Sequence, residues 1–312
     1  MKIIVTGAIG HIGSYLIRDL GVFFPKSNIV MIDNMMTQRF SSLFHLPLSA
    51  NYSFIEGDVS QMNLKSVFLG ADIVIHLAAI TDAAGSIDKA EELEANNFKS
   101  TLRVAEACIE ADASLIALSS TSVYGTQKEQ VDENCSDSEL QPQSPYATTK
   151  LKEEELIASL SKEKGLKAIH CRFGTIFGAS QGMRFHTAVN KFCWQAVMNQ
   201  PISVWSTAYN QKRPYLDLLD ASRAIAFIIN NNIFDGQIYN ILTSNATVKQ
   251  VVDTIKEFVP NIEIEFVDNR IMNQLSYEVL CERFKSQGFV FSGNMRRGIK
   301  ETIDLLKHAN HK

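Results

Sequence analysis

Tyr146 and Lys150 are the residues of this sequence whose types and spacing point most directly to chemistry. They stand four residues apart near the start of a predicted helix over Pro145–Lys164, so their side chains face the same way. A tyrosine acts as a general acid/base when its pKa is brought from about 10 toward neutrality. A nearby ammonium does this because it favours the phenolate. The alternative is a solvated Tyr–Lys pair on a helix surface, which carries no chemistry.

Ser120 is a third candidate because it stands just after a predicted strand over Ser114–Ser119. Parallel α/β sheets bind ligands at the carboxyl ends of their strands. A hydroxyl at that edge could therefore hold a substrate oxygen beside Tyr146. The alternative is a serine-rich turn that only caps the strand.

Three glycines in the pattern Gly7-x-x-Gly10-x-x-Gly13 follow a predicted buried strand over Lys2–Thr6 and open a predicted helix over Gly13–Phe24. Gly7 permits the tight turn, Gly10 lets a pyrophosphate approach the backbone, and Gly13 lets helix and strand pack closely. The helix N-terminus presents free N–H groups and the positive end of its dipole to the phosphates. On its own, the pattern also fits an ordinary strand–turn–helix.

Asp33 gives the glycine pattern its context, because it stands 20 residues after Gly13 at the end of a predicted strand over Asn28–Ile32. An acidic side chain there accepts hydrogen bonds from the adenosine ribose and repels a 2′-phosphate. The sequence therefore favours NAD over NADP, although the nearby Arg39 keeps NADP open. The alternative is a turn residue, since an Asp33-Asn34 dipeptide suits a turn.

The elements that must position these residues alternate along the first half of the chain. Short apolar runs, many of them β-branched, are separated by longer amphipathic stretches, a pattern typical of a parallel sheet covered by helices. The remaining strands and helices expected there are Tyr52–Ile55, Asp72–Leu77 and Lys167–Arg172, with helices over Gln61–Leu69 and Glu91–Ala111. This predicts an α/β fold with a Rossmann-type doubly wound parallel sheet.

After Arg172 the alternation breaks, which predicts a smaller, discontinuous α/β substrate lobe. The elements expected there are a helix over Thr187–Asn199, a strand over Ile202–Trp205 and a helix over Thr247–Val259, while a strand over Gln237–Ile241 rejoins the sheet. We therefore expect a Rossmann domain of residues 1-172 plus 214-241 and a substrate lobe of residues 173-213 plus 242-312.

Composition excludes several classes of protein. The 312 residues are 46% hydrophobic and 21% charged, enough for a sizeable core. The net charge of -4 argues against a nucleic-acid binder. Five cysteines without a paired spacing predict no metal site and fit a reducing, cytoplasmic location. No apolar run reaches the roughly 18 residues of a membrane span, and no targeting segment is visible, so no membrane partner is expected.

Taken together, the motifs resemble those of the extended short-chain dehydrogenase/reductase family, in its nucleotide-sugar epimerase/dehydratase branch, which includes UDP-galactose 4-epimerase. The motifs that carry the resemblance, in chain order, are Gly7-x-x-Gly10-x-x-Gly13, Asp33, Gly57-Asp58, His76-Leu77-Ala78-Ala79, Ser119-Ser120-Thr121-Ser122-Val123-Tyr124-Gly125, Tyr146-x-x-x-Lys150 and Arg172-Phe173-Gly174. The resemblance covers nearly the whole chain. It implies an NAD-dependent enzyme that acts on a nucleotide-diphosphate sugar.

The resemblance implies roles for the three residues of the opening paragraphs. Tyr146 resembles the catalytic base, Lys150 the ribose-binding lysine and Ser120 the hydroxyl that orients the substrate. Asp58 with Val59 resembles the adenine contact, the backbone of Ala78 and Ala79 the surface beneath the cofactor, and Asn97 a structural asparagine. The full set of expected cofactor contacts is Gly7, Ile9, Gly10, His11, Ile12, Gly13, Asp33, Asn34, Asp58, Val59, Leu77, Ala78, Ala79, Thr81, Asn97, Ser119, Tyr146 and Lys150.

The substrate half resembles the family less closely. Arg213 and Arg270 match arginines that hold the nucleotide diphosphate, and a guanidinium offers forked donors suited to phosphate oxygens. The alternative for each is a solvated arginine. The expected substrate contacts are Thr121, Thr175, Arg184, Asn190, Arg213 and Arg270. We interpret His186 as an ordinary surface or satisfied histidine, and Glu153-Glu154-Glu155 as a solvated helix face.

The residues after Ser120 favour one reaction. In 4,6-dehydratases of this family an Asp-Glu pair follows the hydroxyl residue, whereas Thr121 and Ser122 stand here and cannot do that acid–base work near neutral pH. The leading hypothesis is therefore 4-epimerisation of an NDP-sugar. The alternatives are net oxidation at C4 with release of a keto sugar nucleotide, and, more remotely, a catalytically silent NAD-sensing scaffold.

An oligomeric state also follows from the resemblance. It implies a homodimer in which the helices expected over Glu91–Ala111 and Pro145–Lys164 pair with those of a second copy in a four-helix bundle.

Overall fold

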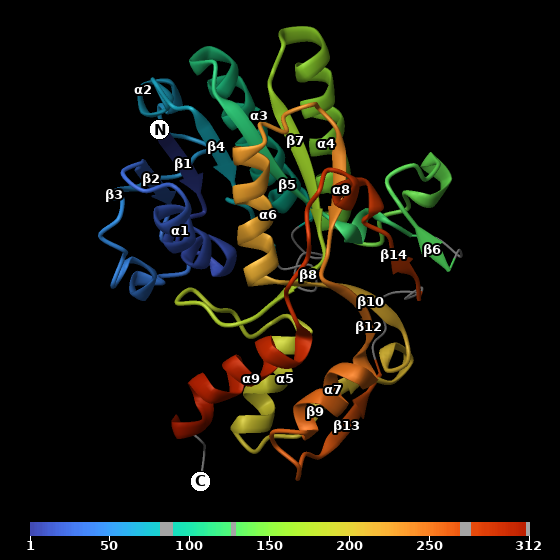
Figure 1. Cartoon of the computed structure of the whole chain (residues 1–312). Helices are drawn as coiled ribbons and strands as arrows, with labels where there is room; N and C mark the ends of the chain where they lie inside the picture. Colours follow the sequence, from blue (N-terminus) through green and yellow to red (C-terminus); the bar gives the residue numbers. More distant parts are fainter. Residues whose placement is uncertain (82–89, 126–128, 269–275, 310–312) are drawn as a thin grey trace.

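The computed structural model of the chain describes residues 1–81, 90–125, 129–268 and 276–309. Its central feature is a sheet of seven parallel strands in the order β3-β2-β1-β4-β5-β7-β11 (Figure 1). The strands are β1 Lys2–Thr6, β2 Asn28–Asp33, β3 Asn51–Glu56, β4 Ile73–His76, β5 Ser114–Ser120, β7 Ala168–Phe173 and β11 Ile238–Ile241. The strand order reverses between β1 and β4, where doubly wound sheets bind their ligands. The expected Rossmann-type α/β fold is confirmed.

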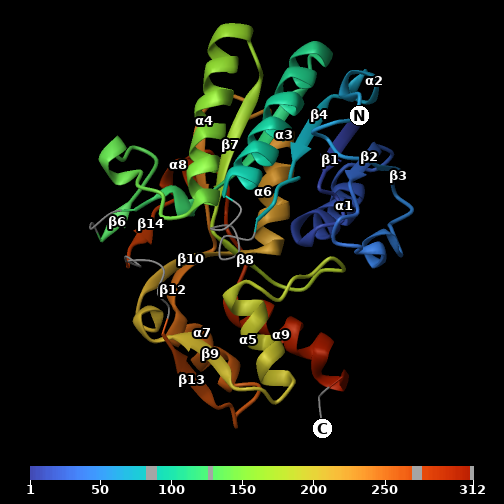
Figure 2. The same cartoon turned by 180° about the vertical axis from the view of Figure 1, so that it is seen from behind.

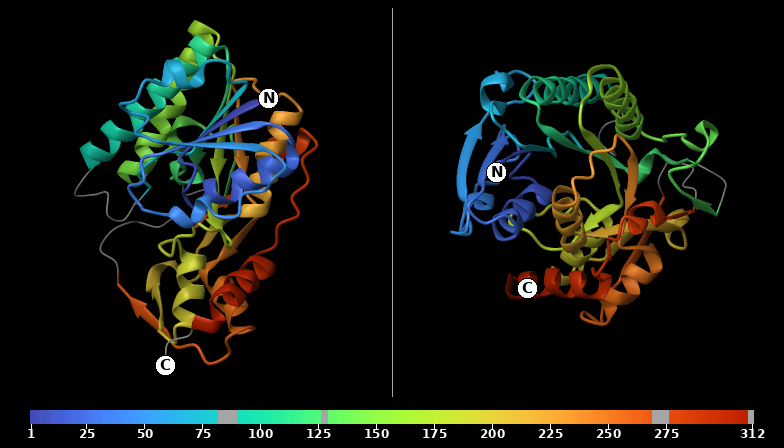
Figure 3. Two further views of the ribbon diagram at one scale, coloured as in Figure 1. Left: turned by 90° about the vertical axis from the view of Figure 1, so that its left-hand side faces the viewer. Right: turned by 45° about the horizontal axis from the view of Figure 1, so that its top comes forward.

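Helices cover both faces of this sheet, and Figure 3 shows the sheet lying between them. Ile3 and Val5 of β1 pack on one side with helices α1 and α6, whereas Ile4 packs on the other side with α2, α3 and α4. All three side chains are fully buried, as expected for a strand covered on both faces. The helices are α1 His11–Phe23, α2 Leu64–Phe68, α3 Ala90–Ala111, α4 Pro145–Lys164 and α6 Leu218–Asn230.

A smaller lobe lies beyond the carboxyl ends of the strands (Figure 2). Its elements are β8 Thr175–Phe177, β9 Ile202–Trp205, β10 Lys212–Asp217, β12 Ser244–Thr247 and β13 Ile264–Val267, with helices α5 Ala188–Val197, α7 Val248–Lys256 and α9 Met295–Leu306. Strand β10 pairs in parallel with β8 and antiparallel with β12, and β9 pairs with β13. The three helices share a core of their own with β9, which keeps the lobe's packing separate from that of the sheet.

Short elements complete the described chain. They are β6 Gln130–Val131, which pairs with β14 Glu278–Val279, the helix α8 Glu282–Ser286, and 3-10 turns at Phe40–Leu43, Thr121–Val123, Asp137–Glu139, Ser206–Ala208 and Lys307–Ala309. Although α8 stands between β13 and α9 of the lobe in sequence, its Phe284 packs with Phe289 in the core that α1 and α6 share with the sheet. None of the described helices combines the length and apolar character needed to cross a membrane.

Element ends differ from the sequence expectations by a few residues. Helix α1 begins at His11 rather than Gly13, with Gly10 as its N-cap. Strand β5 includes Ser120, because Ser120 pairs with Phe173 at the end of β7. Helix α6 is absent from the expected elements. The pairing of Ser120 with Phe173 matters for function, because it fixes this hydroxyl at the rim of the sheet.

Candidate active site

One large cavity, of about 770 Å³, opens at the carboxyl ends of β1, β2, β4 and β5 and continues into the smaller lobe. Its volume lies within the range of ligand pockets. The lining comes from both halves of the fold. Residues after the sheet strands and at the start of α4 form one side, and residues of β8, β9, β10 and the loop before α5 form the other.

The glycine turn after β1 is closed so tightly that side chains are excluded. A Cβ at Gly7, whose φ is +66°, would lie 2.7 Å from the backbone nitrogen of Ala78. A Cβ at Gly13 would lie 2.4 Å from the carbonyl oxygen of Gly7. Gly7, Gly10 and Gly13 all line the cavity together with His11 and Ile12, at the N-terminus of α1. These close backbone contacts bring the N-terminus of α1 to the edge of the cavity, an arrangement that fits the pyrophosphate of a dinucleotide.

Asp33 ends β2 beside this turn and lines the cavity. Its carboxylate accepts hydrogen bonds from the N–H groups of Ile9, at 3.3 Å, and Met35, at 3.0 Å. Burial raises the pKa of Asp33, while these two bonds and the nearby Arg39 act in the opposite direction. The side chain of Ile9 is fully buried, so Ile9 contributes to this corner through its backbone. The arrangement suits a ribose whose hydroxyls donate to a carboxylate.

Most of the other expected cofactor contacts also line the cavity. They are Asn34, Asp58, Val59, Leu77, Ala78, Ala79, Thr81 and Ser119. Asn97 acts from behind this surface. Its Oδ1 accepts from the N–H of Ile80 at 2.8 Å and its Nδ2 donates to the carbonyl of Ile80 at 2.9 Å. Asn97 therefore holds the backbone after β4 in place, as expected of a structural asparagine.

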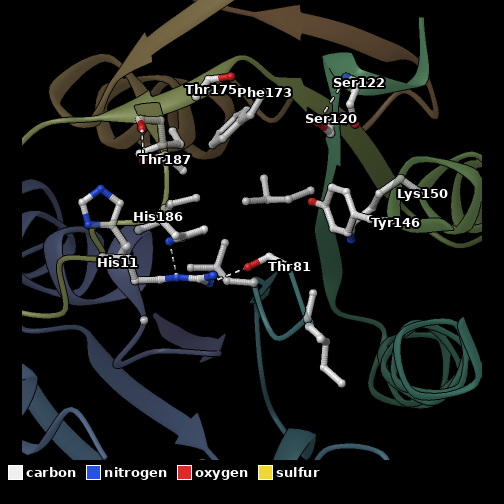
Figure 4. Close-up of a pocket in the computed structure, with 18 of the residues that line it drawn as sticks. His11, Thr81, Ser120, Ser122, Tyr146, Lys150, Phe173, Thr175, His186 and Thr187 are labelled. Atoms are coloured by element: carbon white, nitrogen blue, oxygen red, sulfur yellow. Dashed lines mark hydrogen bonds between the residues drawn. The ribbon is translucent and has the colours of Figure 1, made fainter. Parts of the chain in front are cut away.

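Helix α4 carries Tyr146 and Lys150 to the edge of the cavity. The helix begins after Ser144, whose Oγ accepts from the N–H of Ala147 at 3.2 Å, and has Pro145 in its first turn. Lys150 Nζ lies 5.8 Å from the centroid of the Tyr146 ring. Figure 4 shows the Tyr146 hydroxyl pointing into the cavity, with Ser120 near it on β5. The structure thus brings the three expected catalytic residues to one place.

Ser120 is held by its neighbour. Its Oγ accepts hydrogen bonds from the Ser122 hydroxyl at 2.9 Å and from the Ser122 N–H at 3.2 Å. The Ser120 hydroxyl proton can then be donated to a substrate oxygen. Thr121 also lines the cavity, but it is buried and its hydroxyl donates to the carbonyl of Phe173 at 3.3 Å.

The pKa values of Tyr146 and Lys150 depend on the burial of both side chains and on the charges near them. Burial raises the pKa of Tyr146 above its ordinary value, and the Lys150 ammonium acts in the opposite direction. Burial by itself would lower the pKa of Lys150, but Glu153 and Tyr146 outweigh it and raise that pKa. Lys150 is therefore an ammonium at neutral pH. Tyr146 needs further positive charge close to it before it becomes a phenolate.

The glutamates after Lys150 do not form the solvated helix face expected from the sequence. Only Glu155 is exposed, whereas Glu153 and Glu154 are buried. Glu153 Oε2 lies 2.8 Å from Lys150 Nζ. Glu154 binds Arg172 of β7 with both oxygens, at 2.8 Å to Nε and 2.6 Å to Nη2. A helical period of three to four residues from Lys150 reaches both positions, and this signal in the sequence could have placed them inside.

The substrate contacts expected from the sequence divide into three groups. Thr175, Arg184 and Arg213 line the cavity on its lobe side. Asn190 is fully buried, and its side chain binds both the N–H and the carbonyl of Gly178, at 3.2 and 3.1 Å. The hydrogen bonds of the Asn190 side chain are therefore made to the protein itself, and Asn190 is not among the residues that line the cavity. Arg270 lies outside the described residues.

Two basic side chains on the lobe side of the cavity, those of His186 and Lys191, are absent from the contacts expected from the sequence. His186 faces the cavity, where its Nδ1 accepts from Arg184 Nε at 3.0 Å (Figure 4). Lys191 of α5 lines the same region. Neither carries a motif of its own. Together with Arg184 and Arg213, they give the lobe side of the cavity a basic character suited to phosphates.

His11 ties the glycine turn to the lobe. Its Nδ1 lies 3.0 Å from Ser180 Oγ and its Nε2 lies 3.4 Å from Asn190 Nδ2. Burial lowers the pKa of His11 to about 3, so the ring is neutral. A Cβ at Gly182 would lie 2.3 Å from the carbonyl oxygen of Ile9, so the segment between β8 and α5 packs directly on the turn. The two halves of the site are thereby built against each other.

Comparisons with known proteins agree with this geometry. A model of the NAD dependent epimerase/dehydratase family matches residues 3–241. The uncharacterized UDP-glucose epimerase YtcB of Bacillus subtilis is 30% identical over 267 residues, which are 82% of this chain and 82% of that protein. The trifunctional UDP-glucose 4,6-dehydratase/UDP-4-keto-6-deoxy-D-glucose 3,5-epimerase/UDP-4-keto-L-rhamnose-reductase RHM1 of Arabidopsis thaliana is 28% identical over 316 residues. That match covers 97% of this chain but 46% of RHM1, so the chain spans about half the length of that relative.

Solved structures show the same fold. The UDP-glucuronic acid 4-epimerase of Bacillus cereus, in complex with UDP-glucuronic acid and NAD, superposes with a TM-score of 0.90 at 23% identity. The alignment covers 99% of this chain and 100% of that one.

Proposed function

The chain belongs to the NAD dependent epimerase/dehydratase family, and from that premise we propose that it is a 4-epimerase of a nucleotide-diphosphate sugar. Its cofactor is NAD. One observation carries the choice of reaction. Among the described residues that line the cavity, the carboxylates are Asp33 and Asp58, both at the adenosine end. Beside Ser120, Tyr146 and Lys150 the described lining offers no carboxylic acid for the elimination of water.

In this reaction Tyr146 takes the proton of the sugar C4 hydroxyl and later returns it. NAD held along the Gly7–Gly13 turn and Asp33 would supply a reversible hydride acceptor for C4. Ser120 donates its hydroxyl hydrogen to the C4 oxygen and keeps that oxygen near Tyr146, because Ser122 occupies the Ser120 lone pairs. Lys150 favours the phenolate form of Tyr146. The 4-keto sugar presents its opposite face before the hydride returns, and this inverts C4.

The lobe side of the cavity binds the nucleotide diphosphate in this proposal. Arg213 is held by Gln211 Oε1 at 2.9 Å and by the carbonyl of Lys212 at 3.0 Å, so its guanidinium is oriented before substrate arrives. Arg184 donates to Thr81, which follows β4, and to His186. These contacts place fixed cationic donors opposite the redox residues, so that the diphosphate anchors the sugar above Tyr146.

The test is a panel of UDP-, dTDP-, GDP- and CDP-hexoses incubated with the NAD-loaded enzyme and followed by proton NMR. We expect one of these substrates to reach an equilibrium mixture of its two C4 epimers, with no net change in the absorbance of NADH. Loss of water from the sugar, release of a keto sugar with stoichiometric NADH, or no change in any substrate contradicts the proposal.

A further inference from the structure

The carboxylate of Glu153 lies next to Lys150, the lysine that favours the phenolate form of Tyr146. We propose that Glu153 is a positioning residue of the redox site, whose carboxylate anchors the Lys150 ammonium and sets the pH at which Tyr146 takes up the substrate proton. The inference rests on the proposed function, because it concerns the same proton transfer. It assigns a role to a residue that touches neither the cavity nor, in our proposal, the substrate.

The ion pair is short and shielded from water. Lys150 Nζ and Glu153 Oε2 are 2.8 Å apart, and the two side chains are 7% and 6% exposed. Exposed pairs of this type contribute little, but a buried ammonium that loses its partner is left with an uncompensated charge. Both residues lie on α4, one turn apart, so the helix itself holds Glu153 beneath Lys150. The ammonium is thereby restricted before any cofactor binds.

A comparison with Glu154 supports a role for Glu153 beyond stability. Glu154 uses both oxygens on Arg172, which also donates to the Tyr124 hydroxyl. Glu153 uses Oε2 on Lys150, while its buried Oε1 has no hydrogen-bond partner among the described residues. Buried polar atoms in native structures are nearly always paired, and exceptions are often found at functional sites. The half-satisfied carboxylate is the one that contacts the redox lysine.

The charges around Lys150 leave Glu153 as its main counterion. His76 on β4 and His170 on β7 both face this region, and burial lowers their pKa values to about 3 and about 4, so both rings are neutral at pH 7. On the same strand as His170, Arg172 is paired with Glu154. Arg184, from the loop before α5, adds positive charge on the cavity side of Tyr146.

The direction of the effect follows from these charges. The negative charge of Glu153 raises the pKa of Tyr146 and raises the pKa of Lys150. In Glu153→Gln both pKa values fall. Activity requires Tyr146 as phenolate and Lys150 as ammonium, so the rising limb and the falling limb of a pH profile both move to lower pH. A residue that only stabilised the fold would lower activity without moving either limb.

The experiment compares pH profiles of kcat/KM for the NAD-loaded wild-type enzyme, Glu153→Gln and Glu155→Gln. Glu155 is the exposed neighbour on the same helix and serves as the matched control. For Glu153→Gln we expect the ratio of the rate at pH 6 to the rate at pH 8 to rise about threefold or more. The Glu155→Gln profile should superimpose on that of the wild type. The inference is overturned if kcat/KM of Glu153→Gln falls by the same factor at every pH, or if its pH profile coincides with that of the wild type.

A second readout needs no substrate and therefore separates this inference from the proposed function. The phenolate absorbance of Tyr146 is obtained as the difference between each enzyme and the same enzyme carrying Tyr146→Phe, titrated with NAD bound. The difference curve should move to lower pH in Glu153→Gln. If it moves and no sugar is epimerised, the positioning role stands and the proposed function fails. If it does not move, the positioning role is wrong whatever the activity.

Glu153→Asp covers the case in which the amide variant does not fold. It keeps the negative charge but shortens its reach toward Lys150, so we expect a smaller shift of the same titration in the same direction. A Glu153→Asp curve that coincides with the wild-type curve overturns the inference.

Discussion

The cofactor half and the substrate half of the cavity are built by different means. The cofactor half is shaped largely by backbone, since Gly7 and Gly13 leave no room for a Cβ and the N-terminus of α1 faces the site. The half that we assign to the substrate is lined by side chains on segments from a separate lobe, and these include the long cationic side chains of Arg184 and Arg213. A backbone turn that excludes side chains requires glycines at fixed spacing, which can be recognised in a sequence. Cationic side chains on a separate lobe require no such spacing. The two halves should therefore respond differently to substitution.

The largest effect is expected where the two halves meet, at Tyr146. Tyr146→Phe removes the group that exchanges the proton, so kcat should fall by about 10²- to 10⁴-fold. The affinities for NAD and for the nucleotide sugar should change little, because the ring remains in place. Steady-state kinetics and calorimetric titration with each ligand measure these quantities. A phenylalanine variant that keeps near-normal kcat would remove Tyr146 from the chemistry.

The next largest effect is expected at Gly7. A comparison with Gly70 distinguishes the cost of a steric clash with neighbouring backbone from the cost of a left-handed φ. Gly7 and Gly70 have similar left-handed φ values of +66° and +69°, but a Cβ at Gly70 would meet nothing within 4 Å. Gly70→Ala should lower the free energy of unfolding by about 1 kcal/mol. Gly7→Ala should lower it further and abolish NAD binding, because its Cβ would contact Ala78.

Thermal unfolding and the NAD content of the purified proteins test this comparison. Equal losses of stability in both variants, with NAD retained in Gly7→Ala, would show that the turn is not the cofactor cradle.

The smallest effect is expected in the substrate half. Arg213→Lys keeps the charge but loses the forked donors, so the KM for the nucleotide sugar should rise about tenfold with kcat little changed. NAD content should stay at the wild-type level. Arg296→Lys is the control, because Arg296 is an exposed arginine that pairs with Glu257 outside the cavity. A fall in kcat with unchanged KM would place Arg213 in the chemistry rather than in binding.

The same contrast explains what the sequence could predict. The Rossmann sheet was predictable because its strands are apolar runs that end at polar motifs, and the parallel order then brings Ser120 and Tyr146 together. The burial of Glu153 and Glu154 was also within reach, from their helical spacing to Lys150. Helix α6 carried a signal as well, with Asp217 as its N-cap and apolar residues at helical spacing.

The lobe side was not predictable in this way. His186 faces the cavity because the segment before it packs on the glycine turn, through contacts such as Gly182 N–H to Ser14 Oγ at 2.8 Å. Those partners lie 168 residues apart, and no local pattern reports such a pairing. Asn190 illustrates the same limit. Its amide side chain fits a ligand contact by type, yet the structure uses it on the backbone of Gly178.

In the proposed reaction a hydride leaves C4 of the sugar and returns to C4 of the same sugar. The most direct test follows a nucleotide sugar that carries deuterium at C4 through complete equilibration with the NAD-loaded enzyme. We predict that the deuterium remains at C4 in both epimers, as seen by NMR and mass spectrometry. Loss of the label to solvent, its appearance at another carbon, or its accumulation in NADH beside a released keto sugar would contradict the proposed 4-epimerase.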